Sequence, residues 1–281
     1  MTRIATVDEL IALRREASGR PAETWGLVPT MGALHQGHLS LVKQALQEND
    51  HVVVSIFVNP TQFNNPNDYK TYPRTLDADL AFLAELMQPL YIFTPEEDDI
   101  YRLPDRYEFN LHPLDQYMEG TQRPGHFQGV CRIVSRLLDL TKPTRAYFGE
   151  KDYQQLLIVR KMAEQMHNPV EIVGCPIVRE TSGLAVSSRN ALLSPAHREA
   201  APRIYQTLRA SADYIQQHSV PETAAYIVEH INAAAPLLQC EYVEIANRHT
   251  LTPEAEYQPN CSMAFVAVHA GNVRLIDNFK Y

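Results

Sequence analysis

Cysteine is scarce in this sequence and is not arranged for metal binding or disulfide formation. The 281 residues contain four cysteines, at positions 131, 175, 240 and 261, and no C-x-x-C pair. Zinc ribbons and small disulfide frameworks need closely spaced cysteines, so we expect neither. Scattered cysteines are typical of a protein that works in a reducing compartment.

Long apolar runs and an excess of positive charge are also missing. The N-terminus, Met1-Thr2-Arg3-Ile4, begins no apolar signal core, and no run approaches the length of a membrane-spanning helix. The formal net charge is −8 and the pI is about 5.8, so nucleic acid meets no general basic surface. We expect a soluble, cytoplasmic protein that binds no membrane and no nucleic acid, although a local basic cleft is possible.

Strand and helix patterns alternate along the first 175 residues. Strands are expected at 25–28, 51–58, 90–93, 145–148 and 170–178, and helices after a Thr6–Glu9 capping box, over 39–46, and at 77–87, 127–140 and 153–166. The first helix is expected to end near Gly19. This alternation predicts an α/β fold with a parallel sheet, in which the turns at 29–38, 59–63 and 149–155 converge beyond the strand ends. We expect a polar loop at 59–72 and an irregular segment at 95–126, whose length is typical of a functional loop, a lid or an interface arm.

The pattern changes after about residue 176. A polar loop at 179–190 precedes a long helix that starts at Ser194-Pro195, and a second helix is expected at 221–235. A strand at 241–245 and a hairpin at 263–276, turning at 270–272, complete the pattern. We therefore expect two domains, 1–175 and 176–281, the second being a smaller α+β domain.

A turn with two glycines and two histidines follows the first buried strand. His35 and His38 have the i, i+3 spacing that places both side chains on one face of a helix's first turn. Backbone N–H groups and the helix dipole favour an anion there, and two imidazoles could donate hydrogen bonds to a triphosphate. Gly32 and Gly37 would let the backbone approach that ligand. Alternatively the histidines only cap the helix, whereas a zinc pair is disfavoured because Gln36 supplies no acid.

Three further polar groups suit the same kind of substrate. Lys151 beside Asp152 opens a helix after a strand and could contact a phosphate, although an exposed Lys–Asp pair is the common alternative. The amides of Gln62 and Gln155 could orient a hydroxy acid, although single exposed glutamines are common. The loop 187–190 (Ser-Ser-Arg-Asn) could clamp a polyphosphate leaving group, or could simply precede the next helix.

The chain also contains a set of ordered motifs. They are Pro29-Thr30-Met31-Gly32 with His35-x-Gly37-His38, Phe57-Val58-Asn59-Pro60-x-Gln62-Phe63, Tyr72-Pro73-Arg74-Thr75, Arg123-Pro124-Gly125-His126-Phe127, Phe148-Gly149-Glu150-Lys151-Asp152-x-Gln154-Gln155, Gly183-Leu184-Ala185-x-Ser187-Ser188-Arg189-Asn190 and Arg274-Leu275-Ile276-Asp277-Asn278. H-x-G-H alone is shared by the wider nucleotidyltransferase and class I tRNA-synthetase superfamily, but the ordered set is specific. On these residues the chain resembles the pantothenate synthetase (pantoate–β-alanine ligase) family along nearly its whole length.

The resemblance implies a Rossmann-like N-terminal domain that binds ATP and pantoate, a smaller α+β C-terminal domain that closes over the cleft, and a homodimer. It also implies two half-reactions, with ATP and Mg²⁺ as co-substrate. The carboxylate of (R)-pantoate attacks the α-phosphate and releases pyrophosphate, and the amine of β-alanine then attacks pantoyl adenylate to give pantothenate and AMP. The implied substrates are thus pantoate, β-alanine and ATP, without a tightly bound organic cofactor.

The resemblance also implies roles for individual residues. The catalytic residues would be His38, His35 and Lys151. ATP would be bound by Met31, Gly32, Ala33, Leu34, His35, Gln36, Gly37, His38, Gly149, Glu150, Lys151, Asp152, Val178, Val186, Ser187, Ser188 and Arg189. Pantoate and β-alanine would be bound by Gln62, Gln155, Asn59 and Met31.

Some positions depart from the family pattern. Gln36 stands where an acid is frequent, and Val186 where methionine is usual, but neither change removes a phosphate contact. The neighbourhood of Asp77 and Asp79 corresponds to the family's magnesium region with a loose local match, so the metal ligand stays open. The alternative functions are a nucleotidyltransferase that adenylylates a phosphorylated acceptor and a non-catalytic nucleotide sensor.

Overall fold

The structure, a computed structural model, describes residues 1–17, 23–102 and 104–281. The chain divides into two compact units. Unit 1 comprises Met1–Asp115, Gly120–Glu150 and Gln155–Pro176, and unit 2 comprises Gln116–Glu119, Lys151–Gln154 and Ile177–Tyr281. The sequence-based boundary near residue 176 thus falls beside the start of the last segment of unit 2. The two short segments of unit 2, 116–119 and 151–154, lie within the earlier part of the chain and were not foreseen.

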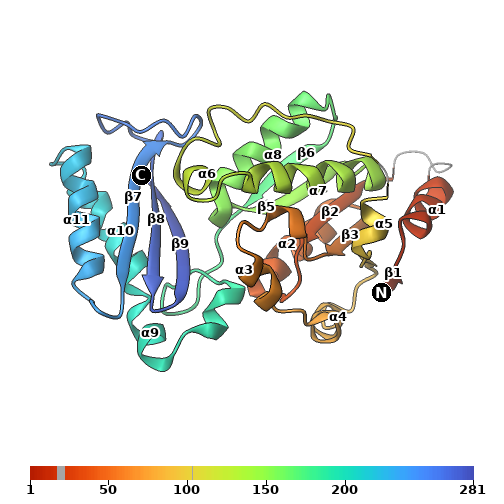
Figure 1. The fold of residues 1–281 in the computed structure, drawn as a ribbon, viewed down its shortest axis with the longest axis horizontal. Helices are drawn as coiled ribbons and strands as arrows, with labels where there is room; N and C mark the ends of the chain where they lie inside the picture. The colour runs from red at the N-terminus through yellow and green to blue at the C-terminus, as the bar shows by residue number, and fades with distance from the viewer. Residues whose placement is uncertain (18–22, 103) are drawn as a thin grey trace. The chain divides into compact units, whose positions relative to one another are not determined.

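Unit 1 contains a six-stranded parallel sheet in the order β1-β4-β3-β2-β5-β6. Its strands are β1 (Thr2–Ile4), β2 (Trp25–Thr30), β3 (His51–Ile56), β4 (Tyr91–Phe93), β5 (Arg145–Gly149) and β6 (Glu171–Cys175) (Figure 1). The predicted parallel α/β fold is confirmed. β2 and β3 pair over their whole length, and most of their residues are buried, as expected for central parallel strands.

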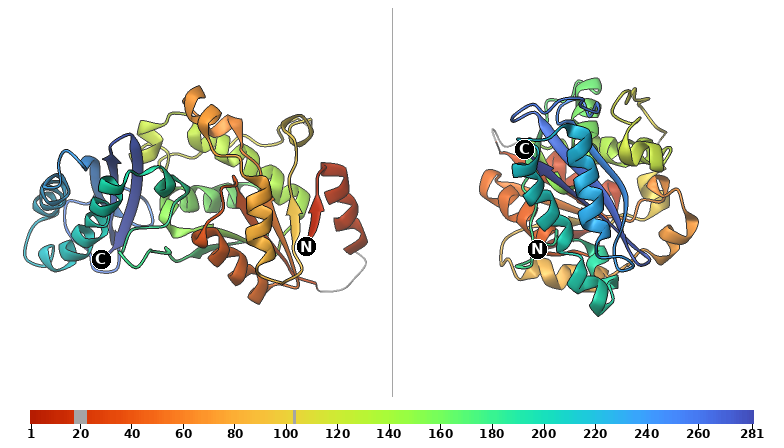
Figure 2. Two further views of the ribbon diagram at one scale, coloured as in Figure 1. Left: turned by 90° about the horizontal axis from the view of Figure 1, so that it is seen from below. Right: turned by 90° about the vertical axis from the view of Figure 1, so that its left-hand side faces the viewer.

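The chain reverses its direction across this sheet at β2. From β2 it continues to β3 and β4 on one side, and it later enters β5 and β6 on the other side. Because parallel crossovers are right-handed, these two sets of connections lie on opposite faces of the sheet. Figure 2 shows helices on both sides of it. The switch point therefore lies between β2 and β5, where open α/β sheets bind ligands at the carboxyl ends of the strands.

The helices of unit 1 follow the predicted pattern with a few additions. They are α1 (Val7–Ala17), α2 (Gln36–Glu48), α3 (Pro66–Thr71), α4 (Leu76–Ala84), α5 (Glu97–Ile100), α7 (His126–Thr141) and α8 (Tyr153–Gln165, whose first two residues belong to unit 2), with the short α6 (Met118–Gln122) at the boundary. The 3₁₀ turns are η1 (Pro60–Gln62) and η2 (Glu150–Asp152). The Thr6–Glu9 capping box begins α1, and the predicted end of that helix near Gly19 lies outside the described residues.

The segment 59–72 was expected to be a loop, which is wrong in part. The Asn59 side chain caps η1 by accepting from the Thr61 N–H at 3.2 Å, and the Asn65 side chain caps α3 by accepting from the Asn67 N–H at 2.8 Å. A proline follows each asparagine at the first helical position, where its missing N–H costs nothing. The two Asn-Pro pairs of this segment therefore begin helical turns, which the prediction of a loop did not include.

Unit 2 is an α+β arrangement with its own core. The antiparallel strands β7 (Gln239–Asn247), β8 (Ser262–Ala270) and β9 (Val273–Lys280) form the sheet β7-β8-β9, and Gly271 takes φ +62° in the β8–β9 turn. The helices are η3 (Ser188–Leu192), α9 (Pro195–Ala200), α10 (Arg203–Tyr214) and α11 (Val220–Asn232). The predicted long helix from Pro195 is divided in two, because Pro202 has no N–H to donate to the carbonyl of Arg198.

An ion-pair group explains why segment 116–119 belongs to unit 2. Arg274 of β9 donates to both carboxylate oxygens of Glu119, at 2.9 and 2.6 Å, and also to Glu241 of β7 at 2.6 Å. The Tyr242 hydroxyl donates to Glu119 at 3.0 Å. A bidentate Arg–carboxylate contact of this kind orders both partners.

Across the residues that the structure describes, no helix is long and apolar enough to cross a membrane.

Gly129 of α7 provides a stability test of the fold. A Cβ at this position would lie 2.2 Å from the Thr61 carbonyl oxygen and 2.7 Å from the Gln62 Cα, so η1 rests directly on the helix backbone. Alanine is favoured over glycine inside a helix by about 1 kcal/mol. The clash should outweigh that gain, because overpacking typically costs about 1–3 kcal/mol. We expect Gly129→Ala to lower the free energy of unfolding, measured by denaturant titration, by about 1–2 kcal/mol.

The matched control is Gly149→Ala. A Cβ at Gly149 would have no heavy atom within 4 Å of it among the described residues. We therefore expect unchanged or slightly raised stability in this variant. A stabilised Gly129→Ala protein would contradict the packing of η1 on α7.

Candidate active site

The turn after β2 has a backbone that few sequences adopt. Gly32 has φ +81° and Ala33 has φ +49°. A left-handed conformation is ordinary for glycine and costs energy for alanine. The turn begins from Thr30, whose hydroxyl donates to the Ser55 carbonyl at 2.8 Å and accepts the Gly32 N–H at 3.3 Å. The two central strands thus fix where the turn starts.

Asp79 of α4 holds the rest of this turn. Its carboxylate accepts the backbone N–H of Ala33 at 3.0 Å and that of Leu34 at 2.7 Å, and the Thr75 hydroxyl donates to it at 3.2 Å. Only 3% of Asp79 is exposed. The sequence had placed this residue in a possible magnesium neighbourhood, whereas its oxygens bind backbone N–H groups. No local pattern connects positions that are 46 residues apart, so sequence reasoning missed this role.

His35 and His38 form a reciprocal cap at the start of α2. The His35 ring accepts the Gly37 N–H on Nδ1 at 3.1 Å, and the His38 ring accepts the His35 N–H on Nδ1 at 3.3 Å. The ring centroids lie 4.0 Å apart. Because each Nδ1 accepts a hydrogen bond, each neutral ring carries its proton on Nε2. The capping role that had been the alternative is therefore present, and it directs both imidazoles to act as Nε2–H donors.

A buried polar network follows β3. Asn59 is 1% exposed, and its Nδ2 group donates to the Gln62 Oε1 at 3.0 Å and to the Gly129 carbonyl at 3.1 Å. Its Oδ1 accepts the Tyr101 hydroxyl at 2.6 Å. Burial raises the pKa of Tyr101, which keeps its hydroxyl protonated as a donor. The Gln62 amide is thereby fixed in one orientation.

The backbone of Gln62 is held as well. His126 Nδ1 lies 2.8 Å from the Gln62 carbonyl oxygen, and Arg123 donates to the same oxygen at 3.4 Å. Both residues belong to the Arg-Pro-Gly-His-Phe motif. This motif is one of those that carry the family resemblance, but no role was predicted for its residues. Together with Tyr101, they are supporting residues that the sequence alone did not identify.

The carboxyl end of β5 supplies the other side of the switch point. Gly149 ends the strand, and Glu150 follows it in η2. The empty space around the Gly149 Cα leaves room for a ligand to approach the backbone. Gln155, half-buried in the first turn of α8, belongs to the same unit.

The remaining predicted residues belong to unit 2. Lys151 is mostly buried, with 19% of its side chain exposed, and its Nζ lies 3.5 Å from the Asp152 carboxylate. That long contact with a half-exposed carboxylate is weak. The Lys151 carbonyl accepts a hydrogen bond from Asn278 at 2.9 Å.

A short hairpin leads to the serines. The Val186 N–H donates to the Val178 carbonyl at 2.9 Å, which pairs the two valines of the predicted ATP site. Ser187 then caps η3 by accepting the Arg189 N–H at 3.2 Å. Lys151 and Ser187 line one small cavity of unit 2. Of the predicted unit 2 residues, these two are therefore close neighbours.

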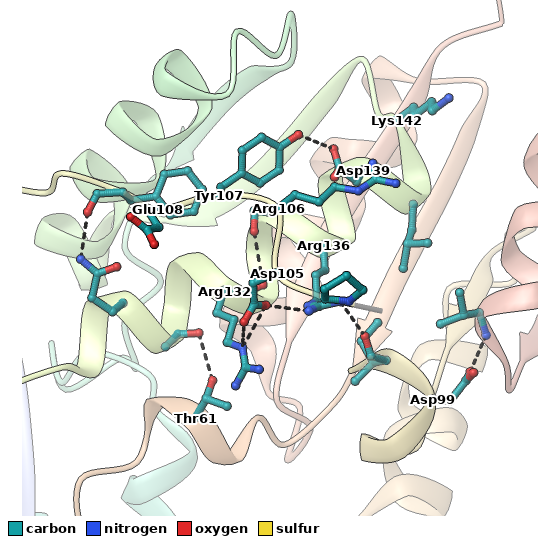
Figure 3. A pocket seen from close by; sticks show the side chains of 18 of the residues that line it. Thr61, Asp99, Asp105, Arg106, Tyr107, Glu108, Arg132, Arg136, Asp139 and Lys142 are labelled. Atoms are coloured by element: carbon teal, nitrogen blue, oxygen red, sulfur yellow. Dashed lines mark hydrogen bonds and ion pairs between the residues drawn. The ribbon is translucent and has the colours of Figure 1, made fainter. Parts of the chain in front are cut away.

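A larger cavity, of about 910 Å³, lies elsewhere in unit 1. Figure 3 shows charged residues of its lining from α5, α7 and the segment 104–109. Asp105 pairs there with Arg132 at 3.0 Å and with Arg136 at 2.6 Å, and these contacts lower the pKa of its carboxyl. Of the predicted site residues, all of which are described by the structure, none lines this cavity.

The structure thus groups the predicted residues into two sets. In unit 1 the turn 31–38, the pair Asn59 and Gln62, and the end of β5 all follow the carboxyl ends of neighbouring strands. In unit 2, Lys151 lies beside the Ser187 loop. The described residues contain no group of three or more His, Cys, Asp or Glu side chains that could hold a metal ion.

Comparisons with known proteins identify what this arrangement belongs to. The model of the family described as pantoate-beta-alanine ligase matches residues 2–280. A pantothenate synthetase from Phocaeicola vulgatus is 54% identical over 275 residues, covering 97% of this chain and 95% of that protein. A pantothenate synthetase from Fervidobacterium nodosum is 43% identical over 282 residues, covering 99% and 98%.

Solved structures agree over the full length. The crystal structure of pantothenate synthetase from Thermus thermophilus has a TM-score of 0.89 and 44% identity, covering 100% of this chain and 99% of that one. The pantoate-beta-alanine ligase from Francisella tularensis, complexed with beta-gamma ATP and beta-alanine, has a TM-score of 0.82 and 39% identity, covering 100% and 97%. With one family matched from end to end in both sequence and fold, the chain belongs to the pantoate–β-alanine ligases, a family of enzymes.

Proposed function

We propose that this chain condenses (R)-pantoate with β-alanine at the expense of ATP and forms pantothenate through pantoyl adenylate. The observation that carries the proposal is the match to the family over residues 2–280. In the first half-reaction the pantoate carboxylate attacks the α-phosphorus, a P–O bond forms, and pyrophosphate leaves. In the second, the amine of β-alanine attacks the acyl carbon of the adenylate, AMP leaves with the C–O electron pair, and the nitrogen loses a proton.

His35 and His38 act on the α-phosphate in this proposal. Their Nδ1 atoms accept backbone N–H groups, so their Nε2–H groups serve as the donors. Negative charge on the nonbridging oxygens is best stabilised by donors that are already oriented before the reaction. The two backbone contacts provide that orientation. Met31, Gly32, Ala33, Leu34, Gln36 and Gly37 complete the wall of the turn at the ATP.

Lys151 and the Ser187-Ser188-Arg189 loop contact the β- and γ-phosphates. Lysine supplies a compact charge, and arginine can bind phosphate oxygens in a bidentate way. The weak contact of Lys151 with Asp152 leaves the ammonium available for a stronger anion. Gly149 and Asp152 contact the adenosine, and Glu150, Val178 and Val186 complete the set of ATP-binding residues.

Gln62 and Gln155 orient pantoate, with Met31 beside them. Asn59 had been expected to contact pantoate alongside Gln62. Both of its Nδ2 hydrogens are already donated to protein acceptors, and its Oδ1 accepts the Tyr101 hydroxyl. Asn59 therefore acts on pantoate through Gln62, as a positioning residue.

Mg²⁺ enters as the ATP complex, held by phosphate oxygens and water. This assignment is supported by the backbone contacts that occupy the Asp79 carboxylate. We further propose that the chain works in the cytoplasm as a homodimer. Closure of unit 2 over the nucleotide would shield the adenylate from water.

Pyrophosphate exchange tests the proposed reaction. With labelled pyrophosphate, ATP and pantoate, the chain should form labelled ATP without β-alanine, because adenylation is reversible and does not require the second half-reaction. Omitting pantoate should abolish the exchange. If folded protein shows no pantoate-dependent exchange, the proposal is excluded. A dinucleotide product in place of AMP would indicate the nucleotidyltransferase instead.

Lys151→Ala tests the phosphate contact. Losing one charged donor to the reacting phosphates should lower the exchange rate by about 10²–10³-fold. The melting temperature should barely change, because the lysine contributes little to the core. Lys43→Ala, at an exposed position of α2, is the control and should keep normal exchange. Loss of folding in Lys151→Ala would mean that its role is structural.

His38→Gln separates capping from catalysis. Glutamine at the third helical position can still accept the N-cap N–H, as in a capping box, but it has no imidazole. We expect a nearly unchanged melting temperature and an exchange rate at least about tenfold lower. His249→Gln, on the exposed surface of unit 2, is the control. Full exchange in His38→Gln would reduce His38 to a capping residue.

A further inference from the structure

Two consecutive polar residues of β9, Asp277 and Asn278, are buried, with 5% and 4% exposure. Consecutive side chains of a strand point to opposite faces of the sheet. Both faces are therefore covered at this point of the strand, whereas the preceding residues of β9 alternate between buried and half-buried. Since buried polar side chains are nearly always hydrogen-bonded, their partners reveal what the pair supports.

The Asn278 face holds the segment that contains Lys151. The Asn278 Nδ2 group donates to the Lys151 carbonyl oxygen at 2.9 Å. Two positions along the same face, the Lys280 Nζ lies 5.7 Å from the centre of the Tyr153 ring. The segment 151–154 thus belongs to unit 2 because β9 binds it at successive residues of one face.

The Asp277 face holds the hairpin before the serines. Arg179 forms a bidentate ion pair with Asp277, with N–O distances of 2.6 and 2.9 Å. The same guanidinium donates to the Gly183 carbonyl at 3.2 Å and stacks 3.7 Å from the centre of the Tyr205 ring. Gly183 has φ +95°, and a Cβ there would lie 2.9 Å from the Tyr205 ring. The tip of the hairpin is therefore tied to β9 through Arg179.

The segment held by Asn278 and the hairpin held by Asp277 both reach the proposed phosphate contacts. Lys151, Ser187 and Asp277 line the same small cavity. The hairpin held by Arg179 continues through the paired Val178 and Val186 directly into Ser187. Adjacent residues of one strand thus fix the backbone on both sides of this cavity.

We propose that Asp277 and Asn278 are positioning residues for the ATP phosphates. Asn278 fixes the main chain of Lys151, and Asp277 fixes the Ser187-Ser188-Arg189 loop through Arg179. This inference rests on the proposed function, in which Lys151 and that loop bind the phosphates. A displacement of about 1 Å in such a group can cost about 10²-fold in rate, so two buried hydrogen-bonding side chains can matter for catalysis without touching the substrate.

A double-mutant cycle on the full-length chain tests the Asn278 arm. The readout is kcat/KM for ATP in pyrophosphate exchange, together with the melting temperature. Asn278→Ala should lower kcat/KM by about 10–100-fold in the wild-type background. In the Lys151→Ala background the further loss should be less than about threefold, since the group that Asn278 positions is already absent. Equal losses in both backgrounds, or no loss in a folded Asn278→Ala protein, would overturn the proposal.

The cycle also separates this proposal from the function on which it rests. If Lys151→Ala alone keeps normal exchange, the ligase reaction stands, but Lys151 makes no phosphate contact and the positioning role of Asn278 is wrong with it. If Lys151→Ala loses exchange while Asn278→Ala keeps it, only the positioning role is wrong. Should Asn278→Ala fail to fold, Asn278→Asp removes the Nδ2 donor with nearly the same side-chain shape. Its kcat/KM is then measured in the same double-mutant cycle.

Asp277→Asn and Asn247→Ala complete the experiment. Asp277→Asn keeps the shape and removes the charge that holds Arg179, so we expect a loss of about tenfold that persists in the Lys151→Ala background. Normal exchange in folded Asp277→Asn would overturn the Asp277 role. Asn247→Ala, in which β7 loses a side-chain hydrogen bond to Glu254 of 3.2 Å, should keep normal exchange with a comparable loss of stability.

Discussion

The carboxylate of Asp79 accepts two backbone N–H groups from the turn that carries the histidines, and the geometry of that turn depends on this contact. Ala33 takes a left-handed conformation that is unfavourable for a residue with a Cβ. A strained backbone persists when the surroundings over-determine it. Here a buried anion supplies the compensation, and α2 then begins at the residue where the histidine cap can form.

The same arrangement recurs at the other proposed contacts. Asn59 fixes the Gln62 amide, and Asn278 holds the Lys151 backbone. In each case a residue that is at most 4% exposed orients a residue that is expected to meet the substrate. Buried polar groups of this kind contribute little net stability, because their desolvation offsets much of their bonding. Their value lies in orientation, which suits a reaction whose catalysis is mostly positioning and electrostatic stabilisation.

How far the sequence could predict this structure depends on the range of each interaction. The parallel sheet, the order of its strands along the chain from β2 to β6 and the start of α1 follow from local periodicity and a capping box, and these were predicted; the edge strand β1 was not. The two Asn-Pro helix starts and the division at Pro202 were local signals too, but they were overlooked. Asp79, Tyr101 and Asn278 could not be assigned roles, because each acts on a group far away along the chain. The candidate site residues were identified through ordered motifs, and both their place in the site and their roles are proposals.

The histidine pair shows why a structural and a functional interpretation need not compete. The cap uses only Nδ1 of each ring, so it leaves the tautomer with the proton on Nε2. A helix N-terminus already favours an anion, and oriented imidazole donors add to that preference without a permanent charge. Donors that the backbone has already oriented suit charge that develops during attack on phosphorus, because only interactions that strengthen in the transition state raise the rate.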